Sequence, residues 1–516
     1  MTAIQLILFI LLVQVIHFLG TWKLYEKAGK KWWEAVIPVY NSIVLMKIIN
    51  RPKWWVIFLF IPIINLLMFP VIWIETIRSF GKKSRLDSIL VLLTLGFYIY
   101  YINYATDAKY VENRSLEPQS GLGDWISSIT FAVIAATLVH TYFMRPYVIP
   151  TSSLEKSLLV GDFLFVSKFH YGARVPMTTI SLPMVHDSIP VIGTGSYLKK
   201  PQLPYYRLPG LQKIKRNEIV VFNWPADTLA TMWGDNSGKF TYKPIDKKTN
   251  YVKRCVGIAG DSLQIIDGDI YINGERSIMP DRAKPQFYYE VDTDGKQISS
   301  RSIRERYNVR EGYVSKEGTY ILNLSEDDLK LLKNNSSVKS ITKKIEPAGK
   351  YDPKLFPHNE QYAWTIDNYG PIYIPKKGET VELNEKSIPF YKHLIEQYEH
   401  HNDVTFNNNE VYIDGEKVSN YTFKQDYYWM MGDNRQSSLD ARFWGFTPMD
   451  HVVGKPVFIW MSFKNGMPWS GGKPRWERFF TTVHGSGKPV SYLYYFLGLL
   501  GAWIVYSNFI KKKKKP

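Results

Sequence analysis

The sequence predicts a mainly β domain joined to several transmembrane α-helices, and three observations lead to that class. Long apolar stretches occur near both ends of the 516-residue chain. The polar middle instead contains short runs of β-branched and aromatic residues at 163–167, 219–222 and 457–460, which are typical of strands and not of βαβ units. Aromatic residues make up 15% of the chain, including 16 Trp, a composition that suits a membrane interface.

Five apolar stretches are candidates for membrane spans, because crossing ~30 Å of hydrocarbon takes about 20 mostly apolar residues. The second contains two prolines and the third is short. If the basic loop between them, 78–85, is cytoplasmic, either the third stretch re-enters instead of crossing or the second forms a hairpin at its prolines. The first is predicted to remain as an anchor, because it has neither a basic segment before it nor a small-residue cleavage site after it. The five stretches are 4–19, 54–77, 89–104, 125–143 and 492–510.

Charge predicts the orientation of the polar middle. Lys and Arg outnumber Asp and Glu by 64 to 47, and a run of lysines at 511–515 follows the last apolar stretch. Basic residues beside a span stay in the cytoplasm, so residues 145–490 are expected on the outer side. The positive charge therefore predicts a lipid bilayer as partner and no nucleic acid. A single cysteine, Cys255, excludes an internal disulfide and paired-cysteine zinc sites, and the sequence predicts no metal and no cofactor.

Reactive side chains first appear just after the fourth apolar stretch. A strand-like segment followed by a proline presents Thr151, Ser152 and Ser153 about eight residues beyond the membrane. A serine needs a nearby base, and none of the ten histidines lies in a recognisable catalytic or metal motif. The other possible base is a lysine whose pKa, ordinarily near 10.4, is lowered by desolvation. Lys253 has an apolar sequence frame that favours this, although a solvated lysine at a strand edge is the ordinary alternative.

A third cluster lies far downstream, between Met431 and Gly445. It begins with turn-forming residues, and Asp440 and Arg442 within it are able to pair and tie a loop down. By itself this cluster predicts only a structured loop.

Together these segments resemble type I signal peptidases, the membrane-anchored Ser/Lys proteases that remove signal peptides from exported proteins. The resemblance covers residues 125–260 and 420–463 and rests on four boxes in one order behind a membrane span. The boxes are Ile149-Pro-Thr-Ser-Ser-Leu-Glu-Lys-Ser-Leu158 with Gly161-Asp162, Lys215-Arg-Asn-Glu-Ile-Val-Val-Phe222, Tyr251-Val-Lys-Arg254 through Gly260-Asp261, and Gly432-Asp-Asn-Arg435 through Asp440 and Arg442 to Trp444-Gly-Phe446.

The resemblance implies a signal-peptidase or LexA-like β fold and a role for each matching residue. Ser153 matches the nucleophile and Lys253 the general base. Thr151 matches the side-chain oxyanion donor, which acts beside the backbone N–H of Ser153, and Ser438 matches the serine that orients the lysine amine. The other matches are a structural ion pair, Asp440 and Arg442, and substrate-pocket positions that are as readily explained as core residues: Ile149, Leu154, Leu158 and Tyr251.

This sequence also departs from the family pattern. Ser152 stands where the family has Gly, and it is an alternative nucleophile. Lys156 stands for Pro, where a cation would lower the pKa of the catalytic lysine further if close and have no effect if solvated. Asn217 and Glu218 stand for Gly-Asp. The departures, with the long segment 276–408, leave an alternative: a non-catalytic peptide-binding membrane scaffold derived from a signal peptidase.

The predicted activity is that of a membrane-bound serine endopeptidase that cleaves signal peptides from exported preproteins after small residues, in the Ala-x-Ala pattern. Preproteins, the lipid bilayer and the secretion machinery are the expected partners. The expected location is the bacterial cytoplasmic membrane, crossed several times, with the catalytic domain on the outer, periplasmic side. The predicted regions are a multi-span region 1–105, a cytoplasmic linker 106–124, an anchor 125–144, a catalytic domain in two parts 145–275 and 409–490, an insertion 276–408, a C-terminal span 491–510 and a basic cytoplasmic tail 511–516.

Overall fold

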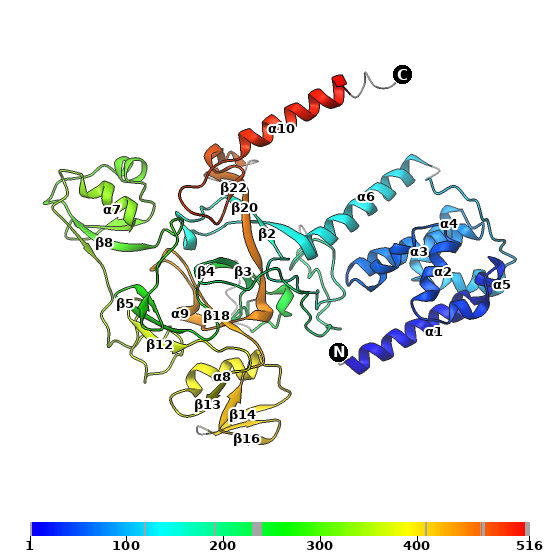
Figure 1. Cartoon of the computed structure of the whole chain (residues 1–516), viewed down its shortest axis with the longest axis horizontal. Coiled ribbons are helices and arrows are strands. Elements are labelled where there is room, and N and C mark those ends of the chain that lie inside the picture. Colours follow the sequence, from blue (N-terminus) through cyan, green and yellow to red (C-terminus); the bar gives the residue numbers. More distant parts are fainter. Residues whose placement is uncertain are drawn as a thin grey trace. The chain divides into compact units, whose positions relative to one another are not determined.

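The computed structural model describes residues 3–117, 120–189, 192–229, 240–407, 410–464, 466 and 470–510, which form two compact units (Figure 1). The first unit combines Met1–Phe143 with Arg174–Leu208 and Tyr242–Lys247, and the second comprises Met144–Ala173, Pro209–Thr241 and Lys248–Pro516. The predicted basic tail, 511–516, lies outside the described residues.

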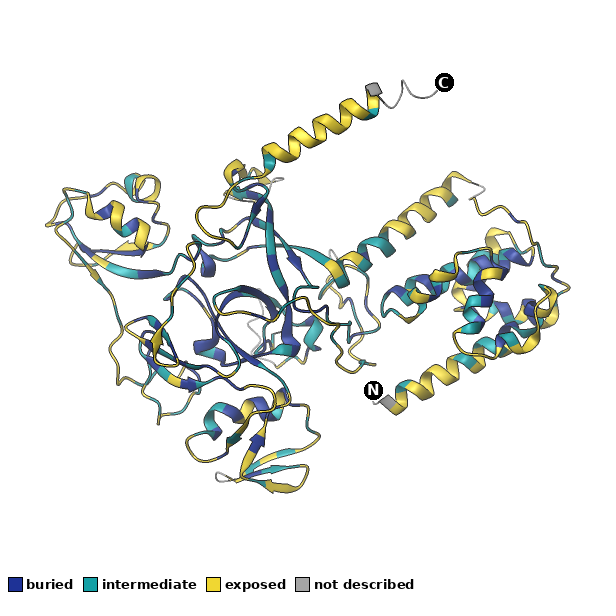
Figure 2. Cartoon of the chain, viewed as in Figure 1, coloured by how far each residue is buried: buried dark blue, intermediate teal, exposed yellow. Residues whose placement is uncertain are grey.

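The first unit is mainly helical over its N-terminal part, residues 3–143. Within the described residues, two of its helices are long and apolar enough to cross a membrane, Ile4–Lys27 and Gly121–Phe143, and most of their side chains are exposed (Figure 2). Exposed apolar helices of this length are suited to lipid. The helices are α1 (Ala3–Lys27), α2 (Tyr40–Ile48), α3 (Ile64–Ser79), α4 (Arg85–Leu93), α5 (Tyr98–Ala105) and α6 (Gly121–Leu138), with short 3-10 helices η1 (Trp32–Ala35) and η2 (Lys53–Phe60).

Two of the predicted apolar stretches are not continuous helices. The stretch 54–77 is divided between η2 and α3, with Pro62 in the break. Proline lacks the N–H that a helix interior requires and so favours a break at Pro62, although α3 accommodates Pro70 within it. The stretch 89–104 is divided between α4 and α5, whose axes differ by 117°. Each of these two stretches is therefore bent or broken and is not one straight helix.

The second unit is built on an antiparallel sheet, which confirms the prediction of a mainly β domain. All three predicted strand runs lie in this sheet, in β2, β3 and β20. Along the sheet the strands are β1 (Met144–Val148), β2 (Asp162–Ser167), β20 (Val452–Lys464), β3 (Ile219–Asn223), β4 (Asn250–Gly257), β18 (Tyr427–Met431) and β19 (Thr447–Pro448), with β21 (Lys473–Pro474) and β22 (Thr481–Thr482) also paired to β20.

Smaller sheets and short helices complete this unit, many of them within residues 276–408. One sheet has the order β12 (Tyr369–Tyr373), β5 (Ser262–Ile266), β6 (Asp269–Ile272), β7 (Glu275–Arg276), and another the order β11 (Ser340–Lys343), β8 (Gln286–Asp292), β10 (Tyr320–Ser325), β9 (Gly312–Val314). The rest are β13 (Thr380–Glu382) with β17 (Asn420–Thr422), β14 (Val404–Asn407) with β15 (Glu410–Ile413) and β16 (Glu416–Val418), and helices α7 (Glu326–Lys333), α8 (Ile388–Gln397), α9 (Ala441–Trp444) and α10 (Leu493–Val505).

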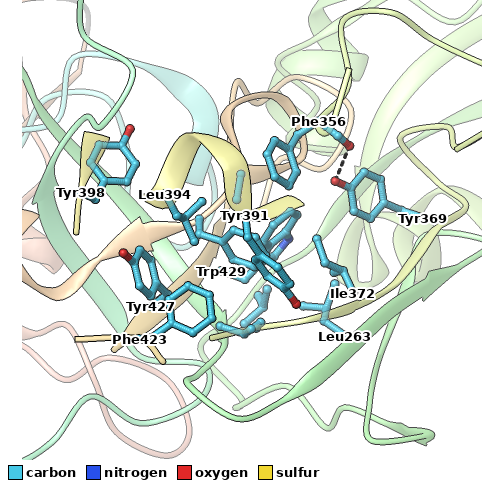
Figure 3. Packing of buried hydrophobic residues seen from close by; sticks show 14 of the residues in the cluster. Leu263, Phe356, Tyr369, Ile372, Tyr391, Leu394, Tyr398, Phe423, Tyr427 and Trp429 are labelled. Carbon is cyan, nitrogen blue, oxygen red and sulfur yellow. Dashed lines mark hydrogen bonds between the residues drawn. The ribbon is translucent and has the colours of Figure 1, made fainter. Parts of the chain in front are cut away.

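A buried aromatic cluster joins the 276–408 segment to strand β18 (Figure 3). Trp429 of β18 is fully buried and packs against Phe356 and Tyr369 of the segment, with ring centroids 6.2 and 5.6 Å apart. Burying aromatic side chains of this size is a large stabilising contribution. The end of β18, where the third sequence cluster begins, is therefore anchored in a core that the 276–408 segment helps to build.

Candidate active site

The serine-bearing turn is fixed by apolar anchors on both sides of Ser153. The turn is a short 3-10 helix, η4 (Ser152–Leu154), and Ser153 is 9% exposed. Ile149, Leu154 and Leu158 are buried in one cluster, which also includes residues of β2, β3 and β20. Because these side chains are buried on the main sheet, the short turn has a defined position on it.

Lys253 lies on a central strand and is buried. Strand β4 pairs with β3 on one side and β18 on the other, and Lys253 is opposite Val220 of β3. The residue is 2% exposed, so the ordinary alternative of a solvated edge lysine is wrong. Burial removes water from the ammonium group and lowers the pKa of Lys253 to about 8. Its Nζ is 5.8 Å from the centroid of the Tyr251 ring.

The carboxylates near Lys253 are already paired with arginines. Arg442 and Asp440, expected as an ion pair, lie 2.8 Å apart, and Arg254 donates two hydrogen bonds to Asp433 at 2.7 and 2.6 Å. Burial alone would raise the pKa of both carboxyl groups, but their arginine partners hold each pKa below its ordinary value. Asp440 and Asp433 still favour the charged form of Lys253, but Arg442 opposes them, and the cost of burying the ammonium outweighs their effect.

Gly432 marks the point where the three sequence clusters meet. Met431 is opposite Arg254, so continuing the antiparallel register places Gly432 beside Lys253. A Cβ added at Gly432 would lie 2.2 Å from Ser438 Oγ and 2.6 Å from the carbonyl oxygen of Ser153. Glycine is therefore required for the close approach of these groups to the strand.

Ser438 presents a buried hydroxyl at this meeting point. The residue is 6% exposed, and its Oγ has no hydrogen-bond partner among the residues that the structure describes. A buried hydroxyl without a partner is costly, so its presence calls for an explanation. The Gly432 N–H donates to Asp440 Oδ2 at 3.1 Å, which links the end of β18 to the loop that contains Ser438.

The remaining predicted residues fall in different places. Thr151 is half-buried and immediately precedes η4. Of the four pocket positions, Ile149, Leu154 and Leu158 lie together in one buried cluster, whereas Tyr251 lies in another and stacks on Trp444 at 5.6 Å. In the described part of the chain, no group of three or more His, Cys, Asp or Glu is arranged to hold a metal ion.

The backbone explains two of the departures from the family pattern. Ser152 lies in the helical turn η4, a conformation that any residue adopts, so glycine is not needed there. Asn217 has a φ of 66°, in the left-handed region, and Asn tolerates that region better than most residues. Lys156 is not solvated, because its ammonium is buried and pairs with Asp328. It is also not among the groups that shift the pKa of Lys253.

Two contacts at this site were given no role by the sequence analysis. The Arg254–Asp433 pair joins residues that both stand in the quoted boxes, directly after Lys253 and Gly432. Asn434 donates its backbone N–H to the Ser153 carbonyl oxygen at 3.1 Å and its side-chain Nδ2 to the Ser152 carbonyl oxygen at 3.3 Å. The only indication in the sequence was that these residue types stand in the boxes, and this does not show which residue pairs with which.

Comparison with known families gives matches for two parts of the chain. The family described as signal peptidase, peptidase S26, matches residues 122–324 and 373–461, which together are more than half of the chain. The chain belongs to the type I signal peptidase family. Residues 33–113 match a separate family of unknown function, DUF5684.

Individual relatives cover most of the chain. Signal peptidase I of Haemophilus influenzae is 25% identical over 380 residues, covering 72% of this chain and 79% of that protein. The Helicobacter pylori enzyme is 25% identical over 373 residues, with coverage of 70% and 93%, and that of Rickettsia typhi is 24% identical over 346 residues, with coverage of 66% and 80%. Membership of this family makes the chain a membrane-associated peptidase of signal-peptide processing, and nothing in these matches supports the non-catalytic scaffold.

The close approach at Gly432 gives a direct test of the site. Replacing Gly432 by Ala forces Ser438 or the Ser153 turn to move, because the new Cβ would overlap both. A displacement near 1 Å typically costs about 100-fold in rate, so we expect preprotein cleavage to fall by about that factor. Gly195→Ala is the matched control, since an added Cβ there meets nothing within 4 Å. Wild-type cleavage by Gly432→Ala would show that the three clusters do not act together.

Proposed function

We propose that the chain is a Ser/Lys endopeptidase in which Ser153 is the nucleophile and Lys253 the general base. The observation that carries the proposal is a buried lysine of lowered pKa at the point where the serine-bearing turn meets the strand; within the described part of the chain, no carboxylate forms an ion pair with it. A serine hydroxyl needs a neighbouring base of suitable pKa, and a desolvated amine supplies one near neutral pH.

The proposed reaction proceeds in two stages. The neutral Lys253 amine takes the proton of the Ser153 hydroxyl while Oγ attacks the scissile carbonyl carbon. The resulting oxyanion accepts hydrogen bonds from the Thr151 hydroxyl and the Ser153 backbone N–H, and the Lys253 ammonium returns the proton to the leaving amine. A water molecule, deprotonated by the same amine, then hydrolyses the acyl-enzyme. Each oxyanion donor of this kind is worth about 2.7–4 kcal/mol in the transition state.

The low pKa matters quantitatively. With a pKa of about 8, about a tenth of the Lys253 side chains are neutral at pH 7. An unshifted lysine would be neutral in less than about a thousandth of molecules at that pH. We propose that the unpaired Ser438 hydroxyl hydrogen-bonds the amine once substrate fills the site, which would orient it toward Ser153.

The proposed substrates are exported preproteins cut after small residues in the Ala-x-Ala pattern. An extended peptide added as a strand beside the site would gain main-chain hydrogen bonds, and shallow apolar pockets would select the small side chains. We further propose a LexA-like catalytic fold, several membrane crossings, and an outer position of the catalytic domain in the inner membrane. The lipid bilayer and the secretion machinery are its proposed partners, and the region boundaries given above complete the proposal.

Cleavage of a preprotein identifies the nucleophile. The detergent-solubilised protein is incubated with a preprotein bearing an Ala-x-Ala site, and the products are analysed by mass spectrometry. We expect Ser153→Ala to abolish cleavage, because no other group replaces its Oγ, while Ser152→Ala cleaves after the same residue as wild type. Cleavage by Ser153→Ala would refute the assignment, and loss confined to Ser152→Ala would move the nucleophile to Ser152.

The pH dependence of kcat/KM identifies the base. Only the neutral amine accepts a proton, so kcat/KM should rise tenfold per pH unit below about 8 and level off above it. The rising part of the kcat/KM profile has its midpoint at the pKa of Lys253, and desolvation moves this midpoint down from near 10.4, the ordinary pKa of lysine. Lys253→Arg keeps the charge but cannot lose its proton in this range, so it should be inactive throughout. A limb centred at 10 or above would contradict a desolvated base.

A further inference from the structure

Three consecutive residues after the Ser153 turn are held by the 276–408 segment. Arg310 forms an ion pair with Glu155 at 3.0 Å, and Gln286 Nε2 donates to the Glu155 carbonyl oxygen at 2.6 Å. The Lys284 backbone N–H donates to Ser157 Oγ at 3.0 Å. Glu155 is 2% exposed, so its end of these contacts is buried, whereas the Arg310 side chain is 35% exposed.

Lys156 stands between these two residues and has an unusual backbone. Its φ is 69°, a left-handed conformation that costs a non-glycine residue about 1–2 kcal/mol. Its side chain is 7% exposed, pairs with Asp328 of α7, and donates to the Asn308 carbonyl oxygen at 2.7 Å. Proline, the family's residue at this position, has φ fixed near −65° and is unable to adopt this turn. The turn therefore depends on contacts that its own sequence does not supply.

The same segment also holds the other side of the Ser153 turn. Asn434, which donates to the carbonyl oxygens of Ser152 and Ser153, is fully buried. Its Nδ2 donates to Glu311 Oε2 at 3.0 Å, and its Oδ1 accepts from Asn323 Nδ2 at 2.6 Å. Both partners belong to the 276–408 segment, so this segment grips the turn directly and through Asn434.

We infer that the 276–408 segment positions the nucleophile, and that Lys156 is the positioning residue through which it holds the turn after Ser153 in its left-handed form. This inference rests on the proposed role of Ser153. The ion pair with Asp328 and the bond to the Asn308 carbonyl offset the conformational cost at Lys156. Without them the residue reverts to an ordinary φ, the three-residue turn before it shifts, and fewer molecules hold Ser153 where it reacts.

Substitutions at Lys156 separate positioning from charge. Both Lys156→Ala and Lys156→Gly lose the ammonium, but glycine adopts a positive φ without penalty. We expect Lys156→Ala to lower kcat for preprotein cleavage about 10- to 100-fold with KM within about twofold of wild type. The kcat of Lys156→Gly should be at least about fivefold higher than that of Lys156→Ala, because glycine removes the cost of the left-handed backbone. The pH limb should stay at its wild-type position in both variants.

Variants of Asp328 test the same Lys156–Asp328 ion pair from its other partner. Asp328→Asn should lower kcat in the same direction, whereas Glu326→Gln removes a charge from the same turn of α7 and should leave kcat unchanged. Thermal unfolding in the same detergent shows whether each variant is folded. Asp328 also caps α7, so Asp328→Asn could fail to fold. In that case the comparison of Lys156→Gly with Lys156→Ala tests the positioning role. If the Lys156 variants do not fold, the comparison of Asp328→Asn with Glu326→Gln tests it.

The inference is overturned if folded Lys156→Ala and Asp328→Asn keep the wild-type kcat, or if Lys156→Gly is no more active than Lys156→Ala. A shifted pH limb would also overturn it, since the effect would then be electrostatic. These results are independent of the proposed nucleophile. An active Ser153→Ala removes the proposed function itself, whereas an inactive Ser153→Ala beside a fully active Lys156→Ala removes only the role of Lys156.

Discussion

The desolvation of the Lys253 amine is the constraint on which the rest of the site depends. Lowering its pKa from 10.5 to about 8 disfavours the charged form by about 3 kcal/mol at neutral pH, a cost that the rest of the fold must offset. An acid left unpaired nearby would cancel the effect by holding the ammonium. Arg442 and Arg254 pair with Asp440 and Asp433, so these acids raise the pKa of the amine by less than burial lowers it.

Close packing around Gly432 brings the Ser153 turn and Ser438 to the strand position beside Lys253. The glycine lets Ser438 and the Ser153 turn approach the strand beside Lys253, while Trp429, three residues earlier, anchors that strand in the aromatic core. The 276–408 segment supplies much of this core and also grips the turn through Lys156 and Asn434. One segment thus supports both halves of the proposed dyad, which explains how a domain made of sequence-distant pieces holds them in register.

The sequence predicted the elements of the site better than their connections. The frame of Lys253, with Tyr251 and Val252 before it and Cys255 and Val256 after Arg254, correctly indicated burial, and Val220 lies opposite it on β3. The Arg254–Asp433 pair was out of reach, since residues so far apart in sequence pair only through the sheet. The left-handed backbone at Lys156 was also hidden, because its partners lie in a segment that no motif covers. In the membrane region, hydropathy located the apolar stretches, and the prolines of 54–77 and the shortness of 89–104 indicated that these two could bend, but the sequence did not fix the break at Pro62 or the angle between α4 and α5.

The most direct test of the account is the titration of Lys253 itself. The Cε resonance of Lys253 is followed by NMR between pH 6 and 11 in protein carrying ¹³C-labelled lysine and the Ser153→Ala change, and it is assigned by its loss in the Lys253→Arg spectrum. The account predicts a midpoint at about pH 8, because the amine is buried and its neighbouring acids are paired. A midpoint at 10 or above would show that the amine is hydrated or paired, and would contradict its role as the base.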